Sequence, residues 1–165
     1  TAICGATETI LLHEKIIKKF GIQILKNLED NGCKIIGDKQ TRKFYKGKIS
    51  KASNKDWSKE YLSPIVSVKS VKNLNEAIKH INKYGTKHTD SIITKNKITA
   101  KKFLTGVNSS IVMHNTSTQF ADGGEFGFGG EVGISTNTLP PRGPVGLNQL
   151  VSYKYQITSN GKTRK

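Results

Sequence analysis

The stretch that decides the fold spans residues 65–85 and reads IVSVKSVKNLNEAIKHINKYG. Its first seven residues alternate apolar and polar side chains and are rich in β-branched residues, which predicts a β-strand over 65–71. Asn73 has the chemistry of a helix cap, with Glu76 three residues later, and apolar residues then recur at helical spacing until Gly85. This stretch therefore predicts a strand followed directly by a capped helix.

The alternation of strands and helices continues upstream of this stretch. Apolar residues at helical spacing predict a helix over 13–30, which the Asn-Gly pair at 31–32 would end, and an apolar run predicts a strand over 33–36. Residues 37–56 are rich in Lys and Ser with little periodicity. We expect a loop there that carries at most one short strand, Lys43 to Tyr45.

Shorter apolar runs complete the pattern downstream. They predict a strand over 91–94, a helix over 96–104 and a strand over 110–113. Ile98, Phe103 and Leu104 would be the apolar side chains that this helix presents. This order of elements favours an α/β fold in which helices cover a sheet. A last apolar strand is expected over 150–157, before a polar and basic tail.

The composition fits one domain with a hydrophobic core and argues against several classes of protein. The chain has 165 residues, of which 35% are hydrophobic. No run approaches the roughly 18 apolar residues that a membrane helix needs, and no signal peptide is visible. The two cysteines stand far apart, which favours free thiols in a reducing cytoplasm. The four histidines show no metal-ligand spacing, so no metal site is expected.

The net charge of +15 is the strongest compositional signal. Such a charge favours an anionic partner, which could be nucleic acid, an anionic lipid or a phosphorylated substrate. The basic residues are spread along the chain, however, and the pattern of basic, Gly and aromatic residues that stacks RNA bases is absent. A solvated basic surface is the simplest interpretation, and a basic nucleic-acid-binding module stays open as the alternative.

Two features carry candidate chemistry. Cys4 precedes a Thr-Glu pair and an apolar run, where backbone N–H groups could favour the thiolate of a nucleophile. This signal is weak on its own, because most single cysteines near a terminus are inert thiols. The segment 114–136 reads HNTSTQFADGGEFGFGGEVGIST and combines small hydroxyl side chains, two carboxylates and repeated Gly. This mixture suits recognition of a polar small molecule, and a flexible loop is the structural alternative.

Several blocks in the same order resemble the gamma-glutamyl phosphate reductase family, a branch of the aldehyde dehydrogenase superfamily that is also called glutamate-5-semialdehyde dehydrogenase. The blocks are CGATETILLH at 4–13, DWSKEYL at 56–62, NEAIKHINKYG at 75–85, RGPVGL at 142–147 and YKYQI at 153–157. The Gly-rich segment and His88-Thr89 belong to the same series. The resemblance covers nearly the whole chain.

The resemblance implies a domain organisation. Residues 1–147 would be the catalytic, nucleophile-bearing domain of an aldehyde-dehydrogenase-like α/β fold, and 148–165 would be an oligomerisation arm and tail that makes a homo-oligomer. The NADP-binding domain of the family lies before the nucleophile, and only three residues precede Cys4. We therefore expect a truncated chain that is inactive alone, unless a separate N-terminal half completes it.

The resemblance also implies an activity. The family makes L-glutamate 5-semialdehyde from L-glutamyl 5-phosphate and NADPH, which is a cytoplasmic step of proline biosynthesis. Cys4 would attack the acyl phosphate and expel phosphate, which gives a thioester, and hydride from the nicotinamide would then reduce the thioester to the aldehyde. The backbone N–H of Cys4 would be one donor to the oxyanion.

By the same resemblance, other residues take roles around Cys4. Glu60 would hydrogen-bond the nicotinamide ribose, and Asn115, Ser117 and Thr118 would face the substrate. The alternatives are a solvated carboxylate for Glu60 and turn-capping groups for the other three.

Four positions, in three places along the chain, depart from the family pattern. Gly5 replaces an Asn, Gln119 replaces an Arg, and Pro140-Pro141 replaces a His-Ala pair. The second change removes a positive charge that we would expect near the substrate.

Overall fold

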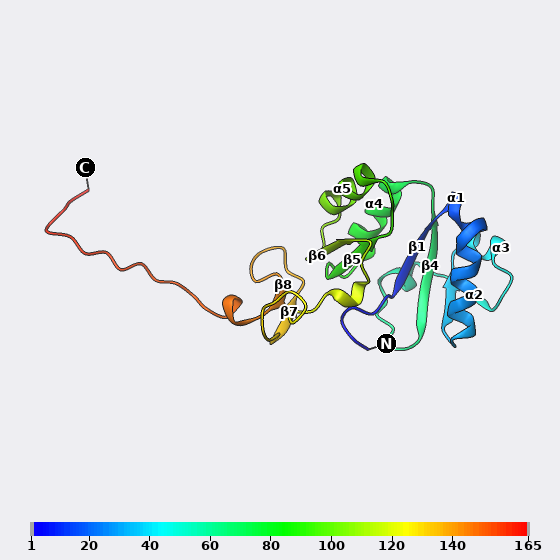
Figure 1. Cartoon of the computed structure of the whole chain (residues 1–165), viewed down its shortest axis with the longest axis horizontal. Helices are drawn as coiled ribbons and strands as arrows, with labels where there is room; N and C mark the ends of the chain where they lie inside the picture. The colour runs from blue at the N-terminus through cyan, green and yellow to red at the C-terminus, as the bar shows by residue number, and fades with distance from the viewer. Residues whose placement is uncertain (1, 165) are drawn as a thin grey trace.

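The computed structural model describes residues 2–164, and a four-stranded parallel sheet forms its centre (Figure 1). The strands follow the order β1-β4-β2-β3, and their bounds are Thr9–His13 for β1, Lys34–Gly37 for β2, Ile49–Lys51 for β3 and Ile65–Val71 for β4. Because β4 pairs with β1 on one side and β2 on the other, it is the most buried strand. The strand predicted over 65–71 is confirmed and lies at the centre of the sheet.

Two smaller sheets follow along the chain. β5 (Thr89–Ile92) pairs in parallel with β6 (Ile111–His114), and β7 (Gly133–Ser135) pairs antiparallel with β8 (Gly143–Val145). The predicted strands at 91–94 and 110–113 are thus present with bounds shifted by one or two residues. The hairpin of β7 and β8 lies partly inside the Gly-rich segment, where composition hides the strand signal.

Helices connect the strands and cover the sheet. Their bounds are Glu14–Ile16 for α1, Ile22–Asp30 for α2, Lys39–Phe44 for α3, Leu74–Tyr84 for α4 and Lys97–Gly106 for α5. A π-helical turn over Ile17–Gly21 joins α1 to α2, so the helix predicted over 13–30 is nearly continuous. α2 and α3 pack on β2, and α4 packs on β4 and α5. The α/β fold class predicted from the element order is confirmed.

Local signals explain where α4 begins and ends. The side chain of Asn73 accepts a hydrogen bond from the N–H of Glu76, as the sequence predicts, and the N–H of Gly85 closes the last turn on the carbonyl of Ile81. Caps of this kind satisfy N–H and C=O groups that a helix end leaves free. They fix the direction in which the chain leaves β4.

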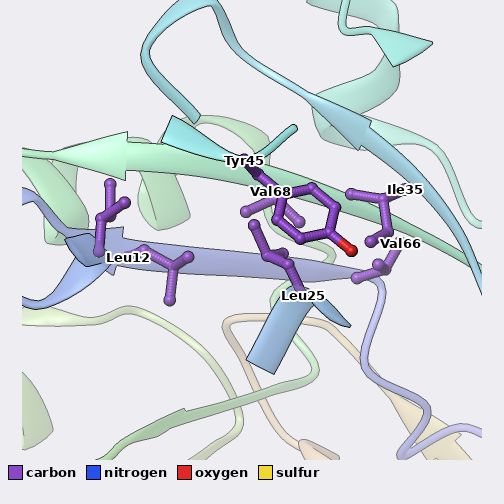
Figure 2. Close-up of a cluster of buried hydrophobic side chains, with 7 residues drawn as sticks. Leu12, Leu25, Ile35, Tyr45, Val66 and Val68 are labelled. Carbon is purple, nitrogen blue, oxygen red and sulfur yellow. The ribbon is translucent and has the colours of Figure 1, made fainter. Parts of the chain in front are cut away.

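The main hydrophobic core lies between the sheet and α2. Figure 2 shows Leu12, Leu25, Ile35, Tyr45, Val66 and Val68 converging from β1, α2, β2, β4 and the end of α3. Ile17 completes this cluster from the π-helical turn. Burial of these side chains, at about 1.5–3 kcal/mol each, is what stabilises the domain.

Two predictions for 37–56 and 96–104 need correction. The first region is not a loop: Asp38 caps α3 by accepting the N–H of Thr41 at 2.7 Å, and β3 follows. The strand expected over Lys43 to Tyr45 is instead the end of α3. On α5 the buried apolar residues are Ala100 and Phe103, whereas Ile98 and Leu104 are exposed.

The terminal strand expected over 150–157 does not form within the chain. This segment leads away from the body as extended, exposed backbone, drawn in orange to red in Figure 1. Its alternate apolar residues, Val151, Tyr153, Tyr155 and Ile157, are all at least 73% exposed. With no neighbouring strand in residues 2–164, its N–H and C=O groups have no ladder to join.

No helix among residues 2–164 combines the length and the apolar character needed to cross a bilayer.

Candidate functional site

Cys4 occupies a tight turn that leads into β1. The turn is closed by the N–H of Ala6, which donates to the carbonyl of Ile3 at 3.0 Å. The thiol is exposed, and its Sγ lies 4.0 Å from the carbonyl oxygen of Ala121. The thiol of Cys4 therefore lies close to the first part of the Gly-rich segment.

Gly5 brings the Cys4 turn into direct contact with a second backbone. Thr118 Oγ1 donates to the carbonyl of Gly5 at 2.7 Å and lies 3.2 Å from Thr7 Oγ1. A Cβ on residue 5 would stand 2.7 Å from the carbonyl oxygen of Thr118 and 2.9 Å from Cα of Gln119. The absence of a side chain at Gly5 is what permits this approach. The two family departures at 5 and 119 are thus in contact.

The Gly-rich segment folds back on itself beyond this contact. Ala121 packs in a small second core with Ile111 and Met113 of β6. Further on, Glu131 Oε2 accepts the N–H of Gly123 at 2.9 Å, which closes the segment into a loop. The loop is therefore tied to β6 at one end and to its own carboxylate at the other.

Glu8 links the Cys4 segment to the segment that carries Glu60. Its Oε1 accepts the backbone N–H of Tyr61 at 3.1 Å. The hydroxyl of Tyr61 in turn bonds Ser67 Oγ of β4 at 2.8 Å and donates to Asp56 Oδ1 at 3.3 Å. Glu60 itself is exposed and forms no ion pair within residues 2–164.

The charge of Glu60 affects the pKa of Glu8. Burial raises the pKa of Glu8; the N–H groups of Tyr61 and Leu62 lower it, and the carboxylate of Glu60 raises it. Because like charges disfavour the ionised form, the negative charge of Glu60 works against ionisation of Glu8.

His88 immediately precedes β5, and its carbonyl accepts the N–H of Ile111 in β6 at 2.9 Å. It is 8% exposed, its Nδ1 bonds Thr89 Oγ1, and its Nε2 is buried without a partner among the described residues. Burial lowers the pKa of His88, while the charges of Glu131 and Glu60 oppose that effect. The pKa of His88 is therefore affected by one carboxylate from each of two segments that are far apart in the sequence.

The three residues expected to face the substrate are bonded mainly to backbone. Asn115 has a positive φ of 56°, and its amide pairs with the N–H and C=O of Thr94 at 2.9 and 3.0 Å. Ser117 accepts the N–H of Gln119 at 3.3 Å. Thr118 holds the Cys4 turn, as described above. Their turn-capping contacts match the alternative that the sequence left open, and their substrate roles stay predictions.

The structure thus brings Cys4, Thr118 and the start of the Gly-rich loop together, and it connects Glu60 to the same segment through Glu8. Sequence reasoning missed the parts played by Glu8 and His88. Glu8 lies within the nucleophile motif, and His88 within a matching block, so both could have been noticed there. No group of three or more His, Cys, Asp or Glu side chains that could hold a metal ion occurs in residues 2–164.

Comparisons with known proteins give one consistent result. The chain is 51% identical over 160 residues to a gamma-glutamyl phosphate reductase of Prochlorococcus marinus (strain NATL2A), covering 97% of this chain and 36% of the relative. It is 50% identical over 163 residues to one from Clostridium perfringens (strain SM101 / Type A), covering 99% and 39%. The chain therefore spans somewhat more than a third of the length of these relatives.

A solved structure gives the same result for the fold. The crystal structure of gamma-glutamyl phosphate reductase from Thermotoga maritima superposes with a TM-score of 0.93 at 43% identity, over 99% of this chain and 39% of that one. None of these relatives is described as binding nucleic acid, so the alternative of a basic nucleic-acid-binding module has no support. The model of the aldehyde dehydrogenase family matches residues 48–154. The chain belongs to the aldehyde dehydrogenase family.

Proposed function

We propose that this chain is the nucleophile-bearing part of a gamma-glutamyl phosphate reductase, which makes L-glutamate 5-semialdehyde from L-glutamyl 5-phosphate in proline biosynthesis. The observation that carries the proposal is the exposed thiol of Cys4, held in a turn against Thr118 and Ala121. The identity to relatives of that name along the whole chain supports it. Biosynthesis of this kind takes place in the cytoplasm, where the thiol stays reduced.

Cys4 performs the first chemical step. Its thiolate forms a bond to the acyl carbon of the substrate, the bond from that carbon to the phosphate oxygen breaks, and inorganic phosphate leaves with the electron pair. The proton of the thiol passes to solvent. Because the resulting thioester is bound to the chain, one difficult displacement becomes two easier ones.

The contacts of Thr118 supply the positioning that this step needs. The hydrogen bond to the Gly5 carbonyl and the packing of Gly5 on the backbone of 118–119 leave the turn little freedom. A nucleophile held in this way keeps the orientation that attack requires. Asn115 and Ser117 shape the neighbouring wall, and the Gly-rich loop provides backbone that can approach a polar substrate closely.

Glu60 is the residue that would hold the cofactor. An exposed carboxylate that forms no ion pair with the residues from 2 to 164, next to the turn that Glu8 bonds, fits ribose hydroxyl groups that donate hydrogen bonds. The family supports an NAD(P)-dependent oxidoreductase, and we propose NADP, which when bound supplies the hydride. The main nucleotide-binding contacts would come from a part corresponding to the remaining length of the relatives.

The tail over 150–157 suits assembly with a second copy of the chain. Its apolar residues alternate, so one face of an extended segment is apolar along its length. Addition of this segment to an exposed sheet edge of a partner would satisfy its backbone groups.

The first half-reaction tests the proposal without a cofactor. We would incubate the chain with glutaryl phosphate, an acyl phosphate that keeps the five-carbon skeleton and terminal carboxylate, and measure phosphate release together with the mass of the protein. We expect one acyl group on Cys4, removed by hydroxylamine. Cys33→Ser should be acylated normally and Cys4→Ser should not.

Free glutathione serves as the reference thiol in this experiment. Absence of an adduct on Cys4, under conditions in which glutathione is acylated, would overturn the proposal. Equal labelling of Cys4 and Cys33 would have the same effect, because it would reduce Cys4 to an ordinary exposed thiol.

A further inference from the structure

Glu8 stands at the junction of two segments that carry the candidate chemistry. It lies four residues after Cys4, immediately before β1, and its own carbonyl accepts the N–H of Ser67 in β4 at 2.9 Å. Its backbone is therefore fixed to the central strand of the sheet. Its side chain points across to the turn that begins at Glu60, where Oε1 accepts the N–H of Tyr61 at 3.1 Å.

The turn that receives this bond is itself well anchored on its other side. Ser63 Oγ donates to the carbonyl of Tyr61 at 3.0 Å, and the ring hydroxyl of Tyr61 is bonded to Ser67 and Asp56. Leu62 adopts a positive φ of 52°, a conformation that a non-glycine residue holds only when its surroundings impose it. Glu60 is the residue next to this fixed turn, and its side chain is exposed.

The arrangement has an electrostatic cost that a purely structural contact would avoid. Glu8 and Glu60 are both acidic, and the charge of Glu60 raises the pKa of Glu8. The chain carries 27 Lys and Arg residues, yet the one ion pair within residues 2–164 joins Lys69 to Glu76. Neither carboxylate takes part in an ion pair within these residues, although Lys59 Nζ lies 5.4 Å from the ring centroid of Tyr61. The hydrogen bond from Tyr61 to Glu8 therefore forms despite the negative charge of Glu60.

We propose that Glu8 is a positioning residue, which fixes the turn of Tyr61 and thereby sets Glu60 relative to Cys4. The path is short: Cys4 and Glu8 share one segment, Glu8 bonds Tyr61, and Tyr61 follows Glu60. This inference rests on the proposed function in one respect. The alignment of Glu60 with Cys4 has a use because Glu60 would hold the cofactor that acts on the acyl group of Cys4. The alignment itself is a property of the chain without ligand.

The test compares Glu8→Ala with Glu8→Gln in the full chain. Alanine removes the acceptor, so the amide of Tyr61 should exchange with solvent about tenfold faster, as expected for the loss of one hydrogen bond. The side-chain oxygen of Gln can accept the same N–H and should restore slow exchange. Glu14→Ala, which removes a carboxylate at the start of α1, serves as the matched control and should leave Tyr61 unchanged.

A second measurement covers the case in which Glu8→Ala fails to fold. The pKa of Glu8 is followed by NMR in the native chain and in Glu60→Gln. We expect the substitution to lower the pKa of Glu8, because it removes a negative charge that now raises it. The response to the change at Glu60 tests whether the two carboxylates lie close enough to interact, as the proposed alignment requires.

Two results would overturn the inference: exchange of Tyr61 that does not change in Glu8→Ala, or a pKa of Glu8 that is the same in Glu60→Gln and in the native chain. Neither measurement involves the thiol of Cys4 or a bound cofactor. Failure of Cys4 acylation would therefore reject the proposed function and leave the role of Glu8 in the fold standing, whereas the opposite outcome would reject only the positioning role.

Discussion

Replacement of Gly5 by alanine is the sharpest perturbation that the structure offers. The added Cβ would lie 2.7 Å from the carbonyl oxygen of Thr118 and 2.9 Å from Cα of Gln119, and both of these are backbone atoms that cannot rotate away. Overpacking of this kind costs about 1–3 kcal/mol. Separation of the two segments would also break the bond from Thr118 to the Gly5 carbonyl, worth about 1 kcal/mol. We therefore expect a loss of about 2–4 kcal/mol in the free energy of unfolding.

Urea denaturation followed by the fluorescence of Trp57, the single tryptophan, measures this loss. Gly133→Ala is the matched control, because a Cβ there meets no atom within 4 Å. In a Cys33→Ser background, the rate of Cys4 alkylation should also change in Gly5→Ala, since the turn that carries the thiol has moved. Equal unfolding free energies for the two alanine variants, with the same alkylation rate, would refute the contact between residues 5 and 118–119.

Three further predictions concern the fold and the site. Leu25→Ala should lower the free energy of unfolding by about 2–5 kcal/mol because Leu25 is 0% exposed, whereas Ile157→Ala on the exposed tail should change it by less than about 0.5 kcal/mol in the same urea titration. Burial lowers the pKa of His80 to about 4, so the neutral form is favoured by folding; stability should fall as the pH drops from 6.5 towards 4, and His80→Gln should flatten this dependence in thermal melts at several pH values. Thr118→Val should lose about 1 kcal/mol while Thr118→Ser keeps the bond to Gly5; equal losses in both would assign the effect to packing.

The parts of the fold that the sequence predicts well are those with a local signal. The strand over 65–71 alternates cleanly, and the helix after it has a cap and a glycine stop, so both were located within one residue. The prediction of a loop over 37–56 was wrong because the helix and strand there are short and the surface is rich in lysine. Asp38 followed by Thr41 was the available sign of a helix cap, and the signal is easy to overlook in a polar stretch.

The candidate site shows the same division. Cys4 and Glu60 could be named from motifs, because a motif carries the residue type that the chemistry needs. The function of Thr118 as a clamp on Gly5 could not be predicted, since it depends on contact between segments more than a hundred residues apart in the chain. Glu8 could have been noticed within the nucleophile motif, but its partner could not be predicted, because that partner is a backbone N–H, which leaves no trace in the sequence.

The position of β4 between β1 and β2 has a consequence for how this protein reaches its native state. β1 precedes the other strands in the sequence, but its neighbour in the sheet is β4, which follows only after α1 to α3 and two other strands. Contacts between such distant segments form slowly, because the intervening chain must lose its freedom before they are gained. The helices and the β2–β3 pair can assemble early. The thiol of Cys4 would reach its native contacts only in the last step, when the distant segments come together. A kinetic refolding experiment should therefore show regain of helix before Cys4 acquires its native reactivity.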